Sequence, residues 1–476
     1  MRNMFSSEWY SRRSFLRASG CGFGALAASS LAASDGQQFH SLHHTPKAKR
    51  VIFLFMAGGV SQVDSFDYKP MLKQFDGKEH DFADARSIAK TGKGLSARVM
   101  KSLWPFSQRG ECGKWTSELF PEISQHVDDL CFLHGMHTEG VAHGPATLFL
   151  HTGATAQIRP SMGSWVSYGL GSLNDNLPTF VTLSPSSGNG GPRNYGNSFL
   201  PAVHQGTAIG RAGISARESG IRFLENTERS ARKQRAQLEL IQLLNRDQME
   251  ARQQTGMVVP NEFEAVLESY EMAWRMQQFA PDIIDLSSES AETKAMYGIG
   301  EKTTDDYGRQ CLMARRLAEA GVRFIQVNYT DNSNNPAWDQ HSNLPKHEDH
   351  ARAVDLPISG LLSDLKQRGL LEDTLVWWGG EFGRNPFAQN NGTGRDHDPN
   401  GFTVWLAGGG VKQAYSYGKT DKFGHRAVAE KTHMHDLHAT VLHLLGLDHE
   451  RLTYRFAGRD FRLTDVSGEV IHPIIS

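Results

Sequence analysis

The sequence places acidic and histidine side chains after several apolar runs, where they are able to bind a metal ion. Asp339 and His341 stand two positions apart, downstream of the apolar run 322–327. On extended backbone, residues two apart point to the same side, so this carboxylate and this imidazole are able to share one ion. A catalytic zinc typically takes three such ligands from the protein, and His397 or Asp396 would supply the third. We expect a divalent cation here, zinc in the first place, with calcium or magnesium as alternatives.

Two more carboxylates occupy similar positions. Glu381 follows the apolar run 374–378, and Asp64 follows the run 51–56. Glu381 would bind the same ion or a second one, or act as a base, and Asp64 is a further candidate ligand. A single Asp-x-His pair is commonly part of a surface loop. The site hypothesis therefore depends on the recurrence of such groups after strand ends.

A second group of chemically active residues surrounds an expected helix start. Proline suits the first turn of a helix, so Pro145 predicts a helix that begins near it. The histidines around it are His134, His137, His143 and His151. A helix N-terminus is able to hold an anion, which would suit the catalytic groups of a hydrolase, and Thr138 and His143 are the candidates. Solvated loop histidines are an equally good interpretation.

The apolar runs also predict the fold. They are 51–56, 130–133, 179–183, 322–327, 374–378 and 402–406, and each is typical of a strand buried on both faces. Helical patterns lie between several of them, for instance at 305–320 and 353–368. Strands that alternate with helices favour an α/β fold. We predict a three-layer sandwich with a mostly parallel central sheet, in which sites form at the carboxyl ends of the strands.

The stretch from about 218 to 296 differs in composition from the rest. It is rich in Glu, Arg, Gln, Lys and Leu, with Leu238, Ile241 and Leu244 at helical spacing. We predict a mostly helical insertion within a single domain that spans 50–476. The basic run 229–235 is typical of a solvated helix face.

Composition limits the function classes. Of the 476 residues, 39% are hydrophobic and 21% charged, and the formal net charge is −2. These values are typical of a globular protein, and a near-neutral chain is not expected to bind nucleic acid. No apolar run reaches the ~18 residues of a membrane-spanning helix. The sequence carries no signal for an oligomeric state.

We interpret residues 1–34 as a twin-arginine signal peptide. Arg12-Arg13 precedes a short, weakly apolar stretch at 20–33 that is rich in small residues, and this is the pattern of that export signal. We therefore expect a periplasmic or secreted protein whose residues 35–49 form a disordered lead-in.

Three cysteines remain outside the predicted signal. They are Cys112, Cys131 and Cys311. An odd number in an oxidising compartment is compatible with one disulfide, for which Cys112–Cys131 is the leading pair. Buried free thiols are at least as good an interpretation.

Taken together, several segments resemble an exported bacterial family called domain of unknown function 1501. The matching segments are 58–67 (GGVSQVDSFD), 160–165 (PSMGSW), 338–341 (WDQH), 379–384 (GGEFGR), 394–397 (GRDH) and 435–440 (HDLHAT). The resemblance covers nearly all of the chain beyond the signal. That family is in turn similar to the alkaline phosphatase and sulfatase superfamily.

The resemblance implies an alkaline-phosphatase-like fold and hydrolysis of sulfate or phosphate esters, those of polysaccharides included, with one or two divalent metals. Carried over by position, Asp339, His341 and His397 would bind one metal. Glu381 stands where the superfamily has an aspartate that binds a second metal. Phe382 stands in the place of the partner histidine, and phenylalanine cannot bind a metal.

The resemblance also leaves the nucleophile open. The sulfatase signature Cys/Ser-x-Pro-x-Arg is absent, and the nucleophile region falls at 138–143. The alternative is therefore a non-catalytic binding or assembly protein on a degenerate sulfatase-like scaffold.

Overall fold

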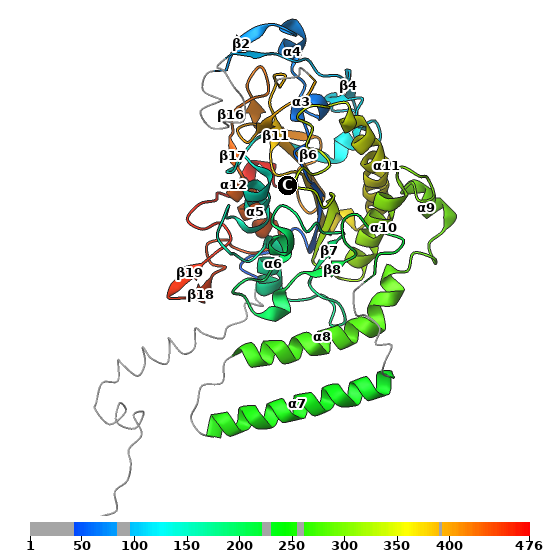
Figure 1. Ribbon diagram of the computed structural model, residues 1–476, viewed down its shortest axis with the longest axis vertical. Coiled ribbons are helices and arrows are strands. Elements are labelled where there is room, and N and C mark those ends of the chain that lie inside the picture. The colour runs from blue at the N-terminus through cyan, green and yellow to red at the C-terminus, as the bar shows by residue number, and fades with distance from the viewer. Residues whose placement is uncertain (1–41, 83–95, 221–229, 255–260, 390–392) are drawn as a thin grey trace, which may run out of the picture.

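A central sheet of nine strands organises the molecule (Figure 1). The computed structural model describes residues 42–82, 96–220, 230–254, 261–389 and 393–476, so the predicted signal at 1–34 lies outside the described residues. The strands run in the order β14-β6-β13-β10-β1-β9-β7-β8, and β17 pairs with β6. Their bounds are β1 (Arg50–Met56), β6 (Leu130–His137), β7 (Phe180–Leu183), β8 (Thr207–Ile209), β9 (Phe324–Tyr329), β10 (Thr374–Gly379), β13 (Phe402–Ala407), β14 (Tyr415–Tyr417) and β17 (Thr432–His433).

The strand directions bring several carboxyl ends to one edge of the sheet. Strand β1 is parallel to both β9 and β10. Strand β13 is antiparallel to β10 on one side and to β6 on the other, so β6 runs in the same direction as β10. The carboxyl ends of β1, β6, β9 and β10 therefore lie at the same edge, together with the beginning of β13.

Helices cover both faces of this sheet (Figure 1). On one face lie α10 (Asp305–Glu319) and α11 (Lys346–Gln367), and on the other lie α5 (His143–Thr152), α6 (Met162–Leu170) and α12 (Met434–Leu444). The predicted α/β three-layer sandwich with a mostly parallel sheet is therefore confirmed. Smaller elements are α3 (Gln62–Ser65), α4 (Pro70–Gln74), α9 (Ala291–Met296) and the strand pairs β2 (Glu79–Asp81) with β3 (Ser96–Arg98), β4 (Phe106–Arg109) with β5 (Lys114–Ser117), β11 (Gly383–Arg384) with β12 (His397–Asp398), β15 (Lys419–Thr420) with β16 (Ala427–Ala429), and β18 (Tyr454–Phe456) with β19 (Arg459–Phe461).

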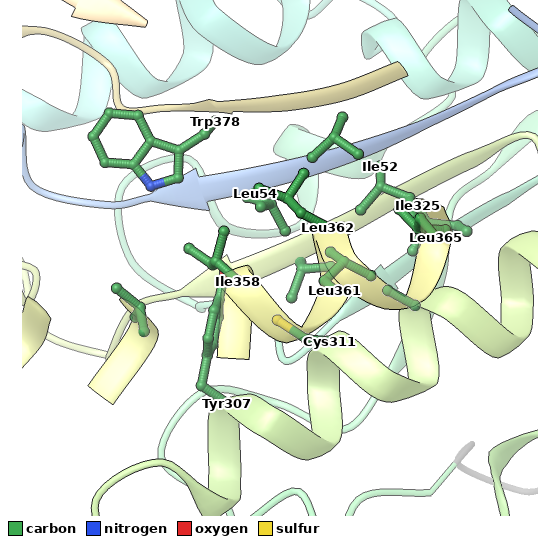
Figure 2. Close-up of a cluster of buried hydrophobic side chains, with 14 of the residues drawn as sticks. Ile52, Leu54, Tyr307, Cys311, Ile325, Ile358, Leu361, Leu362, Leu365 and Trp378 are labelled. Atoms are coloured by element: carbon green, nitrogen blue, oxygen red, sulfur yellow. The ribbon is translucent and has the colours of Figure 1, made fainter. Parts of the chain in front are cut away.

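Strand β1 shows why a continuous apolar run becomes a central strand. Successive side chains point to opposite faces of a sheet. Ile52 and Leu54 join the cluster beneath α10 and α11, as Figure 2 shows, whereas Phe53 and Phe55 join the cluster on the other face. Apolar side chains are needed on both faces of β1 because helices cover both faces of the sheet.

The stretch 218–296 contains two long helices. They are α7 (Ala231–Gln254) and α8 (Asn261–Ile284). Helix α8 contacts α10 and α7, and Figure 1 shows α7 farther from the sheet than α8. Arg235 of α7 lies 2.8 Å from Glu271 of α8 and 2.9 Å from Glu239, so this member of the basic run 229–235 belongs to an ion-paired helix surface.

Two expectations differ from the structure in their details. Residues 42–49 fall within the lead-in that was expected to be disordered, but the Lys47 and Ala48 amides donate to the Leu444 carbonyl at 2.8 and 2.9 Å. Ala48 is 1% exposed, because this segment packs against the end of α12. Within the described residues, Cys112, Cys131 and Cys311 are all free, so no disulfide joins the first two.

We predict that Leu361→Ala lowers the free energy of unfolding by about 2–5 kcal/mol. Leu361 of α11 is 0% exposed and belongs to the same buried cluster as Ile52 of β1 and Ile325 of β9 (Figure 2), so truncation leaves a cavity in the core. Urea denaturation followed by circular dichroism measures the change. Leu243→Ala on α7, where the side chain is 54% exposed, is the control and should stay within about 0.5 kcal/mol. Equal losses from both variants would contradict the packing described here.

Candidate metal centre

Four side chains that bind metals readily meet at the carboxyl edge of the sheet. They are His143, Asp339, His341 and His397, and one ligand atom of each lies within 4.8 Å of those of the others. His143 begins α5 after β6, whereas Asp339 and His341 lie in the loop that follows β9. His397 belongs to β12, just before β13. The three predicted ligands thus lie together, and His143, predicted as a catalytic residue, joins them.

The three imidazoles surround the Asp339 carboxylate. The Nε2 atoms of His341 and His397 lie 3.0 and 3.3 Å from Asp339 Oδ1. The Nε2 atom of His143 lies 3.2 Å from Asp339 Oδ2. The Nε2 atoms of His341 and His397 are themselves 2.9 Å apart. Four electron-rich atoms therefore share a very small volume.

The other nitrogen of each ring has an acceptor behind it. His143 Nδ1 lies 2.7 Å from Glu381 Oε1, and His397 Nδ1 lies 2.6 Å from the Val141 carbonyl oxygen. His341 Nδ1 lies 2.7 Å from Gln389 Oε1. Because these oxygens only accept, each Nδ1 must donate its proton. In a neutral ring, Nε2 then carries a lone pair.

This tautomer makes the residues fit a cation. Three lone pairs and a carboxylate face one another, and neighbouring lone pairs 2.9 Å apart repel unless a positive charge lies between them. Histidine ligands of metals generally show this arrangement, with Nδ1 donating to an oxygen and Nε2 facing the ion. His143, Asp339, His341 and His397 are therefore the residues that would hold a divalent metal. Imidazole and carboxylate donors suit zinc, and also other transition metals.

The electrostatics agree with a centre built around one anion. Burial opposes a charge on His143, but hydrogen bonds with Asp339 and Glu381 outweigh this and raise its pKa. Burial would raise the pKa of Asp339, yet its contacts with the three histidines and Arg384 hold that pKa far below the ordinary range. Burial is the main reason why the pKa of His397 is lowered.

Glu381 lies behind His143. Its side chain is fully buried, and the Gly58 amide donates to Oε1 at 2.9 Å and to Oε2 at 3.1 Å. Since Oε1 also accepts from His143, both carboxylate oxygens already have partners. A carboxylate in this position fixes the ring and increases its basicity as a ligand. The contacts thus give Glu381, predicted as a ligand or base, the geometry of a support for His143.

Arg384 ties the loops of the centre together. Its guanidinium is fully buried and reaches Asp339 Oδ1 at 2.7 Å, the Gly59 carbonyl at 3.0 Å and the Gly58 carbonyl. Gly58 has φ +114°, and a Cβ there would lie 2.6 Å from the Asp339 amide nitrogen. The close approach of these two loops therefore requires glycine.

Asp64 lies outside the group. It is fully buried and pairs with Arg395, whose Nε lies 2.7 Å from Asp64 Oδ2, and it also accepts from Ser61. Arg395 in turn donates to the Met100 and Lys101 carbonyls. Because its oxygens have these partners, Asp64 serves to hold neighbouring loops together.

Two further positions bear on the chemistry. Thr138 directly follows β6, and its buried hydroxyl has no hydrogen-bond partner among the described residues. The Phe382 ring centroid lies 5.1 Å from that of His143 and 4.4 Å from that of His397, and the rings are tilted relative to each other. The His341 side chain is 30% exposed, whereas those of His143, Asp339 and His397 are at most 8% exposed. Solvent therefore reaches the centre past His341.

Apart from Glu381, the residues that support the four side chains of the group were not expected from the sequence. Arg384 and Gln389 are among these supporting residues, as is the Val141 carbonyl. Arg384 stands in the segment GGEFGR, where an arginine next to glycines near a carboxylate was the available signal. The backbone carbonyl and the amide carry no recognisable signal in the sequence.

We predict that Asp339→Asn weakens metal binding at least about a hundredfold, whereas Asp64→Asn leaves the metal content unchanged. The two changes are matched, because each removes a charge from a buried aspartate that is paired with a buried arginine. Elemental analysis and competition with a chelator measure binding, after circular dichroism shows that each variant is folded. His341→Gln, at the most exposed ligand, is a second variant that should also lose metal. Full metal content in both Asp339→Asn and His341→Gln would contradict the ligand assignment.

Residues 48–475 match the family described as "Protein of unknown function (DUF1501)". None of the curated proteins compared with the sequence matches it. Within the described residues, no helix combines the length and the apolar character needed to cross a membrane.

Solved structures similar to this chain include a lipoteichoic acid synthase, an alkaline phosphatase and a sulfatase. The lipoteichoic acid synthase LtaP from Listeria monocytogenes has a TM-score of 0.36 and 8% identity, over 90% of this chain and 78% of that one. A mutant of the alkaline phosphatase TAB5 with Mg bound has a TM-score of 0.34 and 11% identity, over 86% and 100%. The PsFucS1 sulfatase from Pseudoalteromonas sp. has a TM-score of 0.34 and 11% identity, over 89% and 71%. Since the family match extends over almost the whole described chain, the protein belongs to the DUF1501 family.

Proposed function

We propose that this protein is an exported, metal-dependent hydrolase of sulfate or phosphate esters, including those of polysaccharides. The observation that carries the proposal is the convergence of three imidazole lone pairs and one carboxylate at the carboxyl edge of the sheet. Loops at this edge are where α/β proteins generally bind their ligands. The choice of sulfate or phosphate esters comes from the resemblance of the sequence segments to a family that is similar to the alkaline phosphatase and sulfatase superfamily.

Each residue of the centre has a separate task in this proposal. A divalent cation held by His143, Asp339, His341 and His397 would supply Lewis acidity that neutralises the charge of a breaking ester. Glu381 keeps His143 in the tautomer that presents Nε2. Arg384 holds Asp339 in place and balances part of its charge. The low exposure of the centre keeps these interactions strong, because little water screens them.

The contacts favour one metal ion over two. Both oxygens of Glu381 already accept hydrogen bonds. The Phe382 ring packs against His143 and His397, in the place where a ligand of a second metal was considered. We therefore propose a mononuclear centre. The Thr138 hydroxyl, buried and unpaired among the described residues, is the candidate nucleophile near α5.

A specific observation favours the second candidate, a non-catalytic binding or assembly protein. Four protein donors are the number found in closed structural zinc sites, whereas catalytic zinc keeps a position open. The centre offers four donors. A closed metal would stabilise the edge of the sheet and would leave no position for an ester.

We predict that the metal-loaded protein hydrolyses at least one ester from a panel of aryl sulfates and aryl phosphates. Chelation should abolish the activity, and one metal equivalent per chain should restore it, because a single cation supplies the Lewis acid. Product absorbance measures the rate, and His341→Gln is the matched inactive control. A metal-loaded protein that hydrolyses none of these esters would favour the binding protein instead.

We also predict that replacing Arg12 and Arg13 by lysine retains the protein in the cytoplasm. The paired arginines before a short apolar stretch are what the proposed export pathway reads. Cell fractionation followed by immunoblotting locates the protein, and the unchanged chain is the control. Export that persists in the lysine variant would show that another route carries this chain.

A further inference from the structure

Helix α7 turns one side away from the sheet. Its main contact is with α8, and Figure 1 shows α8 between α7 and the sheet. Leu240 and Leu244 of α7 are 54% and 58% exposed. Single exposed leucines are common on protein surfaces, but these two stand four positions apart on one helix, so their side chains are neighbours. The proposed hydrolysis does not involve this surface.

Polar contacts identify the side of α7 that faces α8. Arg235 Nη1 lies 2.8 Å from Glu271 Oε1, and Gln242 Nε2 donates to Glu271 Oε2 at 2.8 Å. Leu240 and Leu244 stand two positions to either side of Gln242. Because a helix turns about 100° per residue, both leucines point to roughly the opposite side from Gln242, away from α8.

The outward side of α7 forms a short apolar stripe with one charge at each end. Its members are all exposed, and spacings of three and four residues keep them on one side of the helix. They are Lys233, Ala236, Leu240, Leu244 and Asp247. Leu243 lies at the margin of this outer stripe. The basic end of the stripe precedes the leucines and the acidic end follows them.

The outer stripe is symmetric in spacing about Leu240 and opposite in charge. Ala236 and Leu244 stand four positions to either side of Leu240 (240 − 236 = 4, 244 − 240 = 4). Lys233 and Asp247 stand seven positions to either side (240 − 233 = 7, 247 − 240 = 7), about 10 Å along the axis. A twofold axis at Leu240 therefore brings Lys233 of each copy opposite Asp247 of the other.

The charges select the direction of such a pairing. In a parallel pair of helices in register, Lys233 would face Lys233 and Asp247 would face Asp247, and like charges are destabilising. In an antiparallel pair both end contacts are attractive, and the N-terminus of each helix dipole lies beside the C-terminus of the other. Twofold symmetry is the commonest in protein oligomers and requires a surface that is complementary to itself. The outer stripe meets this requirement.

We propose that a second copy of this chain packs on the outer stripe, so that two α7 helices pair antiparallel about a twofold axis at Leu240. Leu240 and Leu244 of both copies form the apolar centre of the contact. Lys233 and Asp247 form an ion pair at each end. Because the stripe is short, the dimer is weak and reversible.

The first test measures the mass of the full chain in solution. Sedimentation velocity over a concentration series, from micromolar to millimolar protein, should show a reversible equilibrium between monomer and dimer. Leu240→Glu places two like charges at the axis and should weaken the dimer at least about tenfold. Leu173→Glu, at a leucine that is 45% exposed outside α7, is the matched control and should associate like the unchanged chain.

The second test reverses the charges at the ends of the stripe. Lys233→Glu and Asp247→Lys should each weaken the dimer about fivefold or more, because each places like charges together at both ends. The double variant restores opposite charges and should associate within about twofold of the unchanged chain. Circular dichroism must show that every variant is folded, and metal content must be equal in all of them.

The inference is wrong if the chain stays monomeric throughout the series, or if folded Leu240→Glu associates like the control. It is also wrong if the double variant associates no better than the two single charge variants. None of these results depends on ester hydrolysis, so a failure of the dimer and a failure of the proposed function are distinguishable.

Discussion

The functional edge of this molecule depends on one electrostatic constraint, the crowding of nitrogen lone pairs around a single carboxylate. His143 and His397 each donate Nδ1 to an oxygen that has no proton to give, so in the neutral rings the Nε2 lone pairs face Asp339. Such an arrangement is stable only with positive charge close by. Arg384 supplies part of it through a fully buried contact, and a divalent cation would supply the rest.

The sheet topology makes this convergence geometrically simple. Had β6 run antiparallel to β1, α5 would begin at the opposite edge, and His143 would lie a strand length away from Asp339. Strand β13 lies antiparallel between β10 and β6, so β6 runs in the same direction as β10. His397 comes just before the N-terminus of β13 and therefore lies at the same edge of the sheet. Strand β9 presents different side chains on its two faces, with Ile325 packed against α10 and α11 and Asn328 hydrogen-bonded to Thr182 and to the Leu183 carbonyl of β7. The strands that build the centre of the sheet therefore also position the residues of the candidate metal centre at their ends.

Much of the fold was predictable because apolar runs such as 51–56 have no other good environment than a sheet covered on both faces. The proximity of Asp339, His341 and His397 was predictable because loops at the carboxyl ends of parallel strands meet at one edge of the sheet. Asp64 met the same criteria, yet it serves Arg395. A carboxylate is equally suited to a cation and to a guanidinium, and only three-dimensional proximity decides between them. The lead-in shows a similar limit, because polar residues 42–49 are held through backbone bonds that side-chain patterns do not reveal.

A cation held by His143, Asp339, His341 and His397 would couple metal uptake to folding, because these residues are far apart along the chain. His143 and His397 are separated by 254 positions (397 − 143), so an unfolded chain holds no preformed chelate and has little affinity for the ion. Any free energy of coordination is then added to the stability of the native state, by mass action on the folded form alone. With a cation bound there, the ambient concentration of that free cation would determine how long the native chain resists heat and proteolysis, whatever reaction it performs.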